Sequence, residues 1–170
     1  MPNTIRLPQS AISTGGSPLK WLGLLDVSGR RPAAARASID SGSAGSAGMT
    51  NVLKASGFSP AVPEGVTITG LSLRIRRAQE PGLGTISDTT VTLAKADGTV
   101  SQNKSAGAAW STVLGDVVFG GAGDLWGFAS LTPSDVNHPA FTASLAAMFV
   151  LPSGSLAGRV ELMEFTVHHL

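Results

Sequence analysis

Residues 67–77, with the sequence TITGLSLRIRR, hold the clearest structural signal in the chain. Three apolar side chains alternate there with three polar ones: Leu71, Leu73 and Ile75 against Ser72, Arg74 and Arg76. Because successive residues of a β-strand point to opposite faces, this period of two predicts a half-buried strand with a basic outer row.

Further short strands are expected on both sides of this segment. The same reasoning indicates strands near residues 51–55, 87–94, 117–119, 141–150 and 158–169. Asp97-Gly98 is a hairpin signal that follows the second of these. Thr132 and Pro133 are suited to the cap and first position of a helix, which Pro139 ends within about one turn. The pattern predicts an all-β protein, a single antiparallel β-sandwich or jelly roll with one short helical turn.

Two segments before residue 50 give weaker signals. Residues 21–27 form a short apolar run that could be a first strand or a segment at the domain edge. Residues 30–48 are rich in Ala, Ser and Gly and are expected to be loop or irregular, with a helix over 32–39 as a poorly supported alternative.

Residues 1–19 are expected to form an extended arm in front of a β-sandwich domain at 20–170. Three prolines and the pair Gly15-Gly16 prevent any long regular element in the arm. The arm nevertheless carries side chains suited to a partner: Ile5, Arg6, Leu7, Ile12 and Leu19. It is either a frayed terminus or a segment that docks on a neighbouring subunit.

Composition narrows the classes of function. The chain has 170 residues, of which 14% are charged, against about 25% in an ordinary globular domain. The formal net charge of +1 argues against nucleic-acid binding, and the absence of cysteine excludes disulfides and thiolate sites. There is no apolar run long enough for a membrane span, and no export signal. A surface with so little charge suggests that part of it is covered by a partner.

The sequence nominates no catalytic group, cofactor site or metal site, so we expect a protein that is not an enzyme. The carboxylates are spread over turns, where aspartate has a structural role. His168 and His169 are adjacent in a strand and should point apart, while His138 lies in a loop. No metal or cofactor motif is present.

Two groups of residues have both a functional and a structural interpretation. Arg74, Arg76 and Arg77 are either a polyanion-binding surface or, as we favour, a solvated outer face. Trp110 and Trp126 are either sugar-stacking platforms or, as we favour, aromatics of the core.

Several short motifs follow one another along the chain in an order that resembles a known protein family. The order runs from VPEGVTITGLSLRI at 62–75 through SDTTVTL at 87–93 and NKS at 103–105. It continues with FGG at 119–121, DLWG at 124–127, LTPSDVN at 131–137 and RVE at 159–161. Over residues 50–170 this order resembles the β-sandwich domains of tailed-bacteriophage virion proteins. Members of that family usually end in paired aromatics, where this chain has His168-His169.

The resemblance implies a structural protein of the virion, made in the bacterial cytoplasm. The leading expectation is a capsid decoration (cement) protein, a trimer or dimer that binds the major capsid protein or other virion proteins through its arm. The alternatives are a neck, collar, tail or tail-fibre component, or a carbohydrate-binding module for host attachment.

Overall fold

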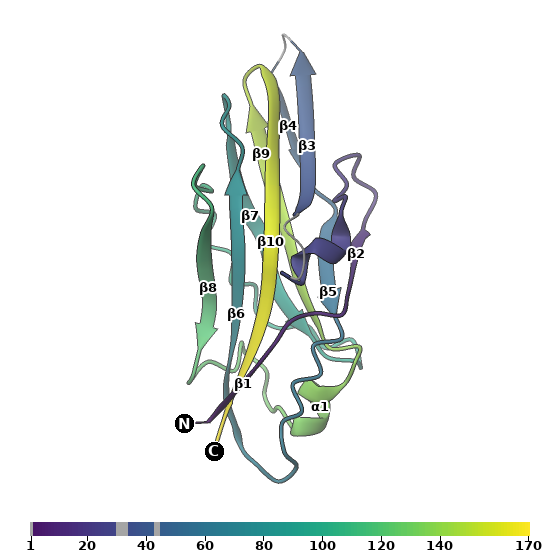
Figure 1. Ribbon diagram of the computed structural model, residues 1–170, viewed down its shortest axis with the longest axis vertical. Coiled ribbons are helices and arrows are strands. Elements are labelled where there is room, and N and C mark those ends of the chain that lie inside the picture. Colours follow the sequence, from purple (N-terminus) through teal and green to yellow (C-terminus); the bar gives the residue numbers. More distant parts are fainter. Residues whose placement is uncertain (1, 30–33, 43–44) are drawn as a thin grey trace.

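The protein is a sandwich of two antiparallel β-sheets, which confirms the predicted fold class (Figure 1). A computed structural model of the chain describes residues 2–29, 34–42 and 45–170. Sheet A contains β1 (Asn3–Arg6), β3 (Ala35–Gly42), β6 (Ile68–Gln79), β8 (Gly115–Gly121) and β10 (Gly154–His169). Sheet B contains β2 (Ser10–Thr14), β4 (Ser46–Met49), β5 (Val52–Ser56), β7 (Thr85–Ala94) and β9 (Thr142–Leu151).

Strand β6 has the two faces that its sequence predicts. Leu71, Leu73 and Ile75 are fully buried between the sheets. Ser72, Arg74 and Arg76 point to the outer side of sheet A. On either side, β6 pairs with β10 and β8, so it lies inside the sheet. The alternation therefore marks a strand with one core-facing side.

Strand β10 changes face along its length because it contains a β-bulge. The register with β6 shifts between Val160 and Leu162. Val160 and Met163 are consequently both buried, although a regular strand would point them to opposite faces. The bulge accounts for the change of apolar face in the sequence of 158–169.

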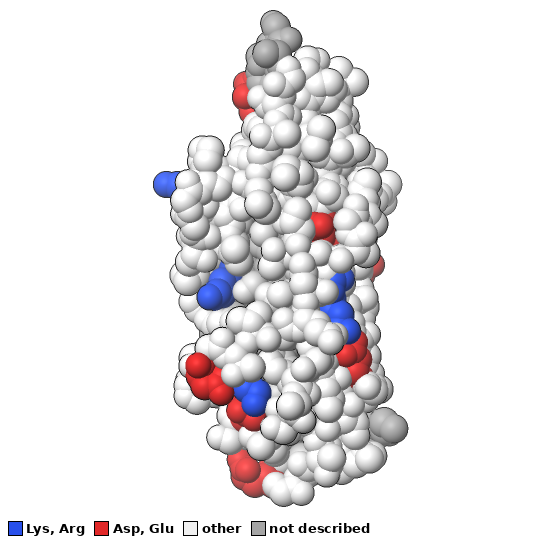
Figure 2. Space-filling model, turned by 180° about the vertical axis from the view of Figure 1, so that it is seen from behind, with Lys and Arg blue, Asp and Glu red and all other residues white. Residues whose placement is uncertain are grey.

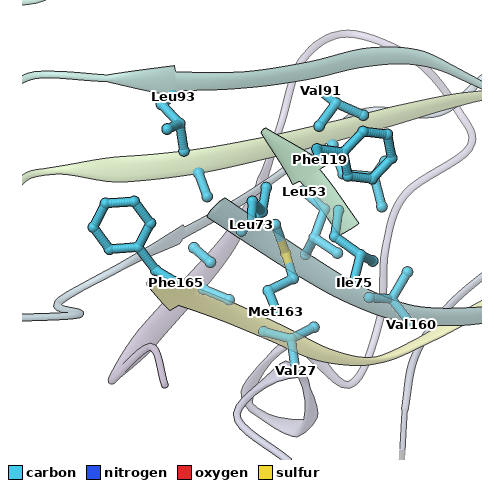
Figure 3. Packing of buried hydrophobic residues seen from close by; sticks show 14 of the residues in the cluster. Val27, Leu53, Leu73, Ile75, Val91, Leu93, Phe119, Val160, Met163 and Phe165 are labelled. Atoms are coloured by element: carbon cyan, nitrogen blue, oxygen red, sulfur yellow. The ribbon is translucent and has the colours of Figure 1, made fainter. Parts of the chain in front are cut away.

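The core lies between the two sheets and is closed by aromatic rings. Figure 3 shows Leu73, Ile75 and Phe165 of sheet A packed towards Leu53, Val91 and Leu93 of sheet B. The rings of Phe58 and Phe141 lie 5.4 and 5.1 Å from that of Phe165, tilted against it. Such tilted pairs are the favoured geometry for aromatic side chains.

The short helix and the hairpin turn form where the sequence predicts them. In α1 (Pro133–Asn137), the Asp135 N–H donates to the Thr132 side chain, and the Asp135 carboxylate accepts from the Thr132 N–H. This reciprocal cap satisfies two free donors of the first turn. The Asp97-Gly98 turn is closed by a bond from the Lys95 N–H to Thr99 O. Within the described residues, no helix has the length and apolar character needed to cross a membrane.

The first strand considered for residues 21–27 does not form, and the loop expected for 30–48 is wrong for the described part of that segment. Residues 24–27 form a 3-10 turn, η1 (Leu24–Val27), instead of a strand. The described part of 30–48 is mostly β3 and β4, which also excludes a helix from residue 35 onward; residues 30–33 and 43–44 lie outside the described residues. Strand β3 forms because β10 offers a long edge to pair with, and its Ala35 and Ala37 are buried there. Small residues carry little strand propensity, so only the neighbouring strand decides their conformation.

The segment 1–19 is not a separate arm. Strand β1 pairs with β10 in sheet A, and β2 pairs with β5 in sheet B. The prolines limit how long these strands are but do not prevent pairing on either side of Pro8, which is itself buried. The predicted boundary between residues 19 and 20 therefore separates no structural unit, because this segment ties the two sheets together.

Candidate functional site

The outer side of sheet B is a broad surface with almost no charge. The strand registers align the following outward positions: Ser10, Ile12 and Thr14 of β2; Ala47 and Met49 of β4; Val52, Lys54 and Ser56 of β5; Thr85, Ser87, Thr90, Thr92 and Ala94 of β7; Thr142, Ser144, Ala146, Met148 and Val150 of β9. We call this set the neutral face. Lys54 is its one charged member.

The neutral face combines hydroxyl groups with exposed apolar side chains. Ile12, Met49 and Val150 each expose about half of their surface, 48%, 47% and 48%. The Thr89 hydroxyl donates to Met49 Sδ at 3.4 Å, so the methionine is directed towards β7. Figure 2 shows this side of the molecule, where the charged groups are few and separated by wide uncharged areas.

The outer side of sheet A is charged, and the charges at its centre are paired. Arg74 forms two hydrogen bonds with the Glu164 carboxylate, at 2.9 and 2.8 Å, and Asp116 bridges Arg74 and Arg76. The hydrogen bond from Arg76 is the main reason that the pKa of Asp116 lies below its usual value. The predicted basic row is thus neutralised by acidic residues of β8 and β10, as the solvated-face interpretation requires.

Arg77 does not belong to that outer row, contrary to the expectation from sequence. Its side chain is 7% exposed and bonds the Asp88 carboxylate at 2.7 Å. Its guanidinium lies 4.8 Å from the ring centre of Trp110, whose indole N–H donates to the other Asp88 oxygen at 2.8 Å. Burial raises the pKa of Asp88 and lowers that of Arg77, since both charges are removed from water. This cluster links β6 of sheet A to β7 of sheet B.

Trp126 is an anchor of the core. It is fully buried, and its indole N–H donates to Leu71 O at 2.9 Å. The backbone at Trp126 has a φ of +56°, stabilised by a bond of 2.7 Å from its N–H to the Asp124 carboxylate. Gly120 leaves room for the ring, because a Cβ there would lie 2.3 Å from the indole nitrogen. The GG…DLWG block is therefore a packing motif.

Neither predicted tryptophan is available to stack on a sugar. Trp110 is 4% exposed and Trp126 is not exposed at all. The same holds for the other aromatic residues: all 3 Trp and 6 Phe side chains of the chain are buried. A core of this size needs all of them, which is the physical reason that the structural interpretation is correct.

The five residues predicted to bind a partner do not form one patch. Ile5, which is 47% exposed, pairs with Thr166 on the outer side of sheet A, whereas Ile12 lies on the neutral face of sheet B. Arg6 is exposed, Leu7 is half-buried and Leu19 is buried in the protein's own interior. Leu19 is excluded from partner binding, and only Ile12 adds to the neutral face. The sequence missed this face because most of its members are ordinary Ser, Thr and Ala residues from five separate strands.

The histidines have separate surroundings, as predicted. His168 Nε2 lies 2.9 Å from the Ser72 hydroxyl on the outer side of sheet A, and partial burial lowers its pKa. His169 is 7% exposed, with Nε2 at 3.5 Å from the Thr4 hydroxyl. His138 lies at the end of α1. The described part of the chain brings together no group of three or more residues suited to a metal ion.

Comparison with known proteins gives likenesses of shape alone. No protein-family model and no curated protein matches the chain. One similar solved structure is described as "CBM4 structure and function", with 11% identity, a TM-score of 0.39, and coverage of 96% of this chain and 92% of that one. Another is the CBM22-1 xylan-binding domain from Paenibacillus barcinonensis Xyn10C, with 7% identity, a TM-score of 0.43, and coverage of 98% and 92%. Both likenesses concern the fold, and the resemblance to virion domains stays a prediction.

Proposed function

We propose that this protein is a non-enzymatic β-sandwich binding module that docks through the neutral face of sheet B onto a larger protein assembly. The observation that carries the proposal is the single charge, Lys54, among the outward positions of that face. The centres of protein interfaces are depleted in charged residues and enriched in methionine. Docking there would bury little charge and would cover Ile12, Met49 and Val150.

More specifically, we propose that the protein is a structural component of a virion and decorates a bacteriophage capsid. The order of motifs over residues 50–170 supports a role in a virion. A position in the neck, collar or tail is the alternative to a position on the capsid. A broad uncharged surface fits a lattice, on which many weak contacts add up through multivalency. We propose docking through the neutral face instead of through an N-terminal arm, because residues 1–19 belong to the sandwich. Their removal would delete strands from both sheets.

Two acidic residues placed on the neutral face should abolish docking. In Met49→Glu/Val150→Glu, both new carboxylates would have to lose water in the interface, so affinity for capsids that lack this protein should fall about a hundredfold or more. Co-sedimentation with the capsids measures the effect. The control Thr112→Glu/Ser134→Glu adds the same charge at exposed sites outside sheet B and should bind normally. Equal binding by the two double variants would contradict the proposal.

Carbohydrate binding is the second candidate, and one observation favours it. Thr85, Ser87, Thr90 and Thr92 place their hydroxyl groups in a row along β7 on the neutral face. Hydroxyl groups of this kind can donate to and accept from a polysaccharide. The burial of all the aromatic side chains weighs against it, because no ring is left for stacking.

The variant Thr90→Val/Thr92→Val separates the two candidates. It removes two hydroxyl groups but keeps the shape and the neutrality of the face. If the protein binds a glycan, affinity on a panel of bacterial polysaccharides should fall at least about tenfold in this variant. If it docks on protein, capsid binding should persist. Absence of binding across the panel by the unmodified protein excludes the glycan candidate.

A further inference from the structure

Strand β8 is an open edge of sheet A. It pairs with β6 on one side, and no described residue pairs with its other side. In Figure 1 it forms the left-hand margin of the front sheet. Val117 and Val118 are 36% and 57% exposed, and the strand contains neither proline nor lysine. Proteins normally protect an edge with such residues, because a free edge invites pairing with another strand.

The other edges of the described sandwich are short or are partly covered by other backbone. Beyond β7, an irregular segment supplies backbone bonds from Ser101 and Lys104 to Leu93 O and Val91 O. Beyond β3, Leu22 exchanges two backbone bonds with Arg36. Strands β1 and β2 have only 4 and 5 residues. Among the longer described edge strands, β8 is thus the one with no backbone partner anywhere on its free side.

The backbone groups available on this edge follow from the alternation of β6. Leu71 directs its N–H and C=O to the β8 side, where they bond Asp124 O and the Trp126 indole. Because the direction alternates with a period of two, the N–H and C=O groups of Leu73, Ile75 and Arg77 also point to β8. The backbone groups of their partners Phe119, Val117 and Gly115 therefore point to β6. The N–H and C=O groups of Asp116 and Val118 consequently point away from the sheet.

We propose that two copies of this chain associate through β8, antiparallel about a two-fold axis at Val117, to form one continuous sheet A. Asp116 of each copy then exchanges two backbone bonds with Val118 of the other, which gives four bonds in all. This association is independent of the neutral face, which lies on the other sheet.

Charge and size select this register among its neighbours. A shift that centres the axis on Asp116 places two carboxylates opposite each other, which is unfavourable. A shift that centres it on Val118 recruits Gly120, whose φ of +77° is not that of a strand. The register centred on Val117 places Asp116 opposite Val118 and Phe119 opposite Gly115, a large side chain beside a small one. Asp116 also enters the interface already paired with Arg74 and Arg76.

Crosslinking tests the axis, since the chain has no cysteine of its own. At a non-hydrogen-bonded pair on the axis the two Cα atoms lie about 4.5 Å apart, within the range of a disulfide. Full-length Val117→Cys should therefore oxidise to a covalent dimer well before the control Val100→Cys, which is also exposed but lies in a hairpin. Equal rates for the two variants would overturn the proposal.

Two opposite charges at Val118 test the register. Val118→Asp puts a second carboxylate opposite the partner's Asp116 and should weaken the dimer about tenfold, whereas Val118→Lys puts an ammonium there and should strengthen it. Sedimentation equilibrium over a concentration series measures both, and thermal melting checks that each variant is folded. Equal weakening by the two variants would overturn the register. A monomer mass for the unmodified protein up to about 1 mM would overturn the dimer.

Discussion

Replacing Asp88 with Asn is expected to lower the free energy of unfolding by about 3–5 kcal/mol. The substitution keeps an oxygen that can accept from the Trp110 indole but removes the negative charge that balances Arg77. The Arg77 side chain is 7% exposed, and its Nε already lacks a hydrogen-bond partner, so water could do little to solvate the unpaired cation. Urea unfolding followed by tryptophan fluorescence measures the loss.

The double variant Arg77→Met/Asp88→Asn shows whether the cost comes from the unpaired charge. It removes both charges while leaving the acceptor for Trp110 in place. Since a buried ion pair replaced by neutral side chains is often near neutral in stability, the double variant should be more stable than Asp88→Asn alone. A double variant as unstable as the sum of the two single ones would contradict this account. The exposed ion pair of Arg36 and Glu80 is a control, and Glu80→Gln should have little effect.

The second large effect is expected for Gly120→Ala, which should lower the free energy of unfolding by at least about 3 kcal/mol. The backbone at Gly120 has a φ of +77°, and a Cβ there would lie 2.3 Å from both Leu71 O and the Trp126 indole nitrogen. Backbone and a buried ring both resist moving. The variant should therefore disturb the bond between Trp126 and Leu71, with a change in tryptophan fluorescence.

Two other glycines separate strain from collision. Gly98 has a φ of +89° with nothing within 4 Å of the added Cβ, so Gly98→Ala should cost only the conformational part, about 1–2 kcal/mol. Gly123 has open space around an added Cβ, and its φ lies outside the left-handed region, so Gly123→Ala should be close to neutral. If the alanine variants of Gly120, Gly98 and Gly123 all lose the same stability, then close packing of Gly120 against Trp126 is not the role of the GG…DLWG block.

The sequence was sufficient for strands that have one buried side. Alternation in 67–77 and 87–94, the Asp-Gly turn and the cap at Thr132 are local patterns, and each corresponds to the observed element. It failed for 30–48, where small residues carry no preference and pairing with β10 decides the conformation. It failed again for residues 1–19, whose strands exist only because β10 and β5 provide partners far along the chain.

The sequence by itself thus determined the class of fold and the low charge of 14%, because periodicity and composition are properties of the chain alone. Only the tertiary structure decided where that neutrality lies. Pairing of acidic side chains with Arg74 and Arg76 neutralises the outer side of sheet A, while the outward positions of sheet B, mostly Ser, Thr and Ala, hold a single charge at Lys54. The tertiary structure also shows that three residues considered for a binding surface are buried in the interior: Arg77, Trp110 and Trp126. The register between distant strands sets both results, and no local pattern encodes that register.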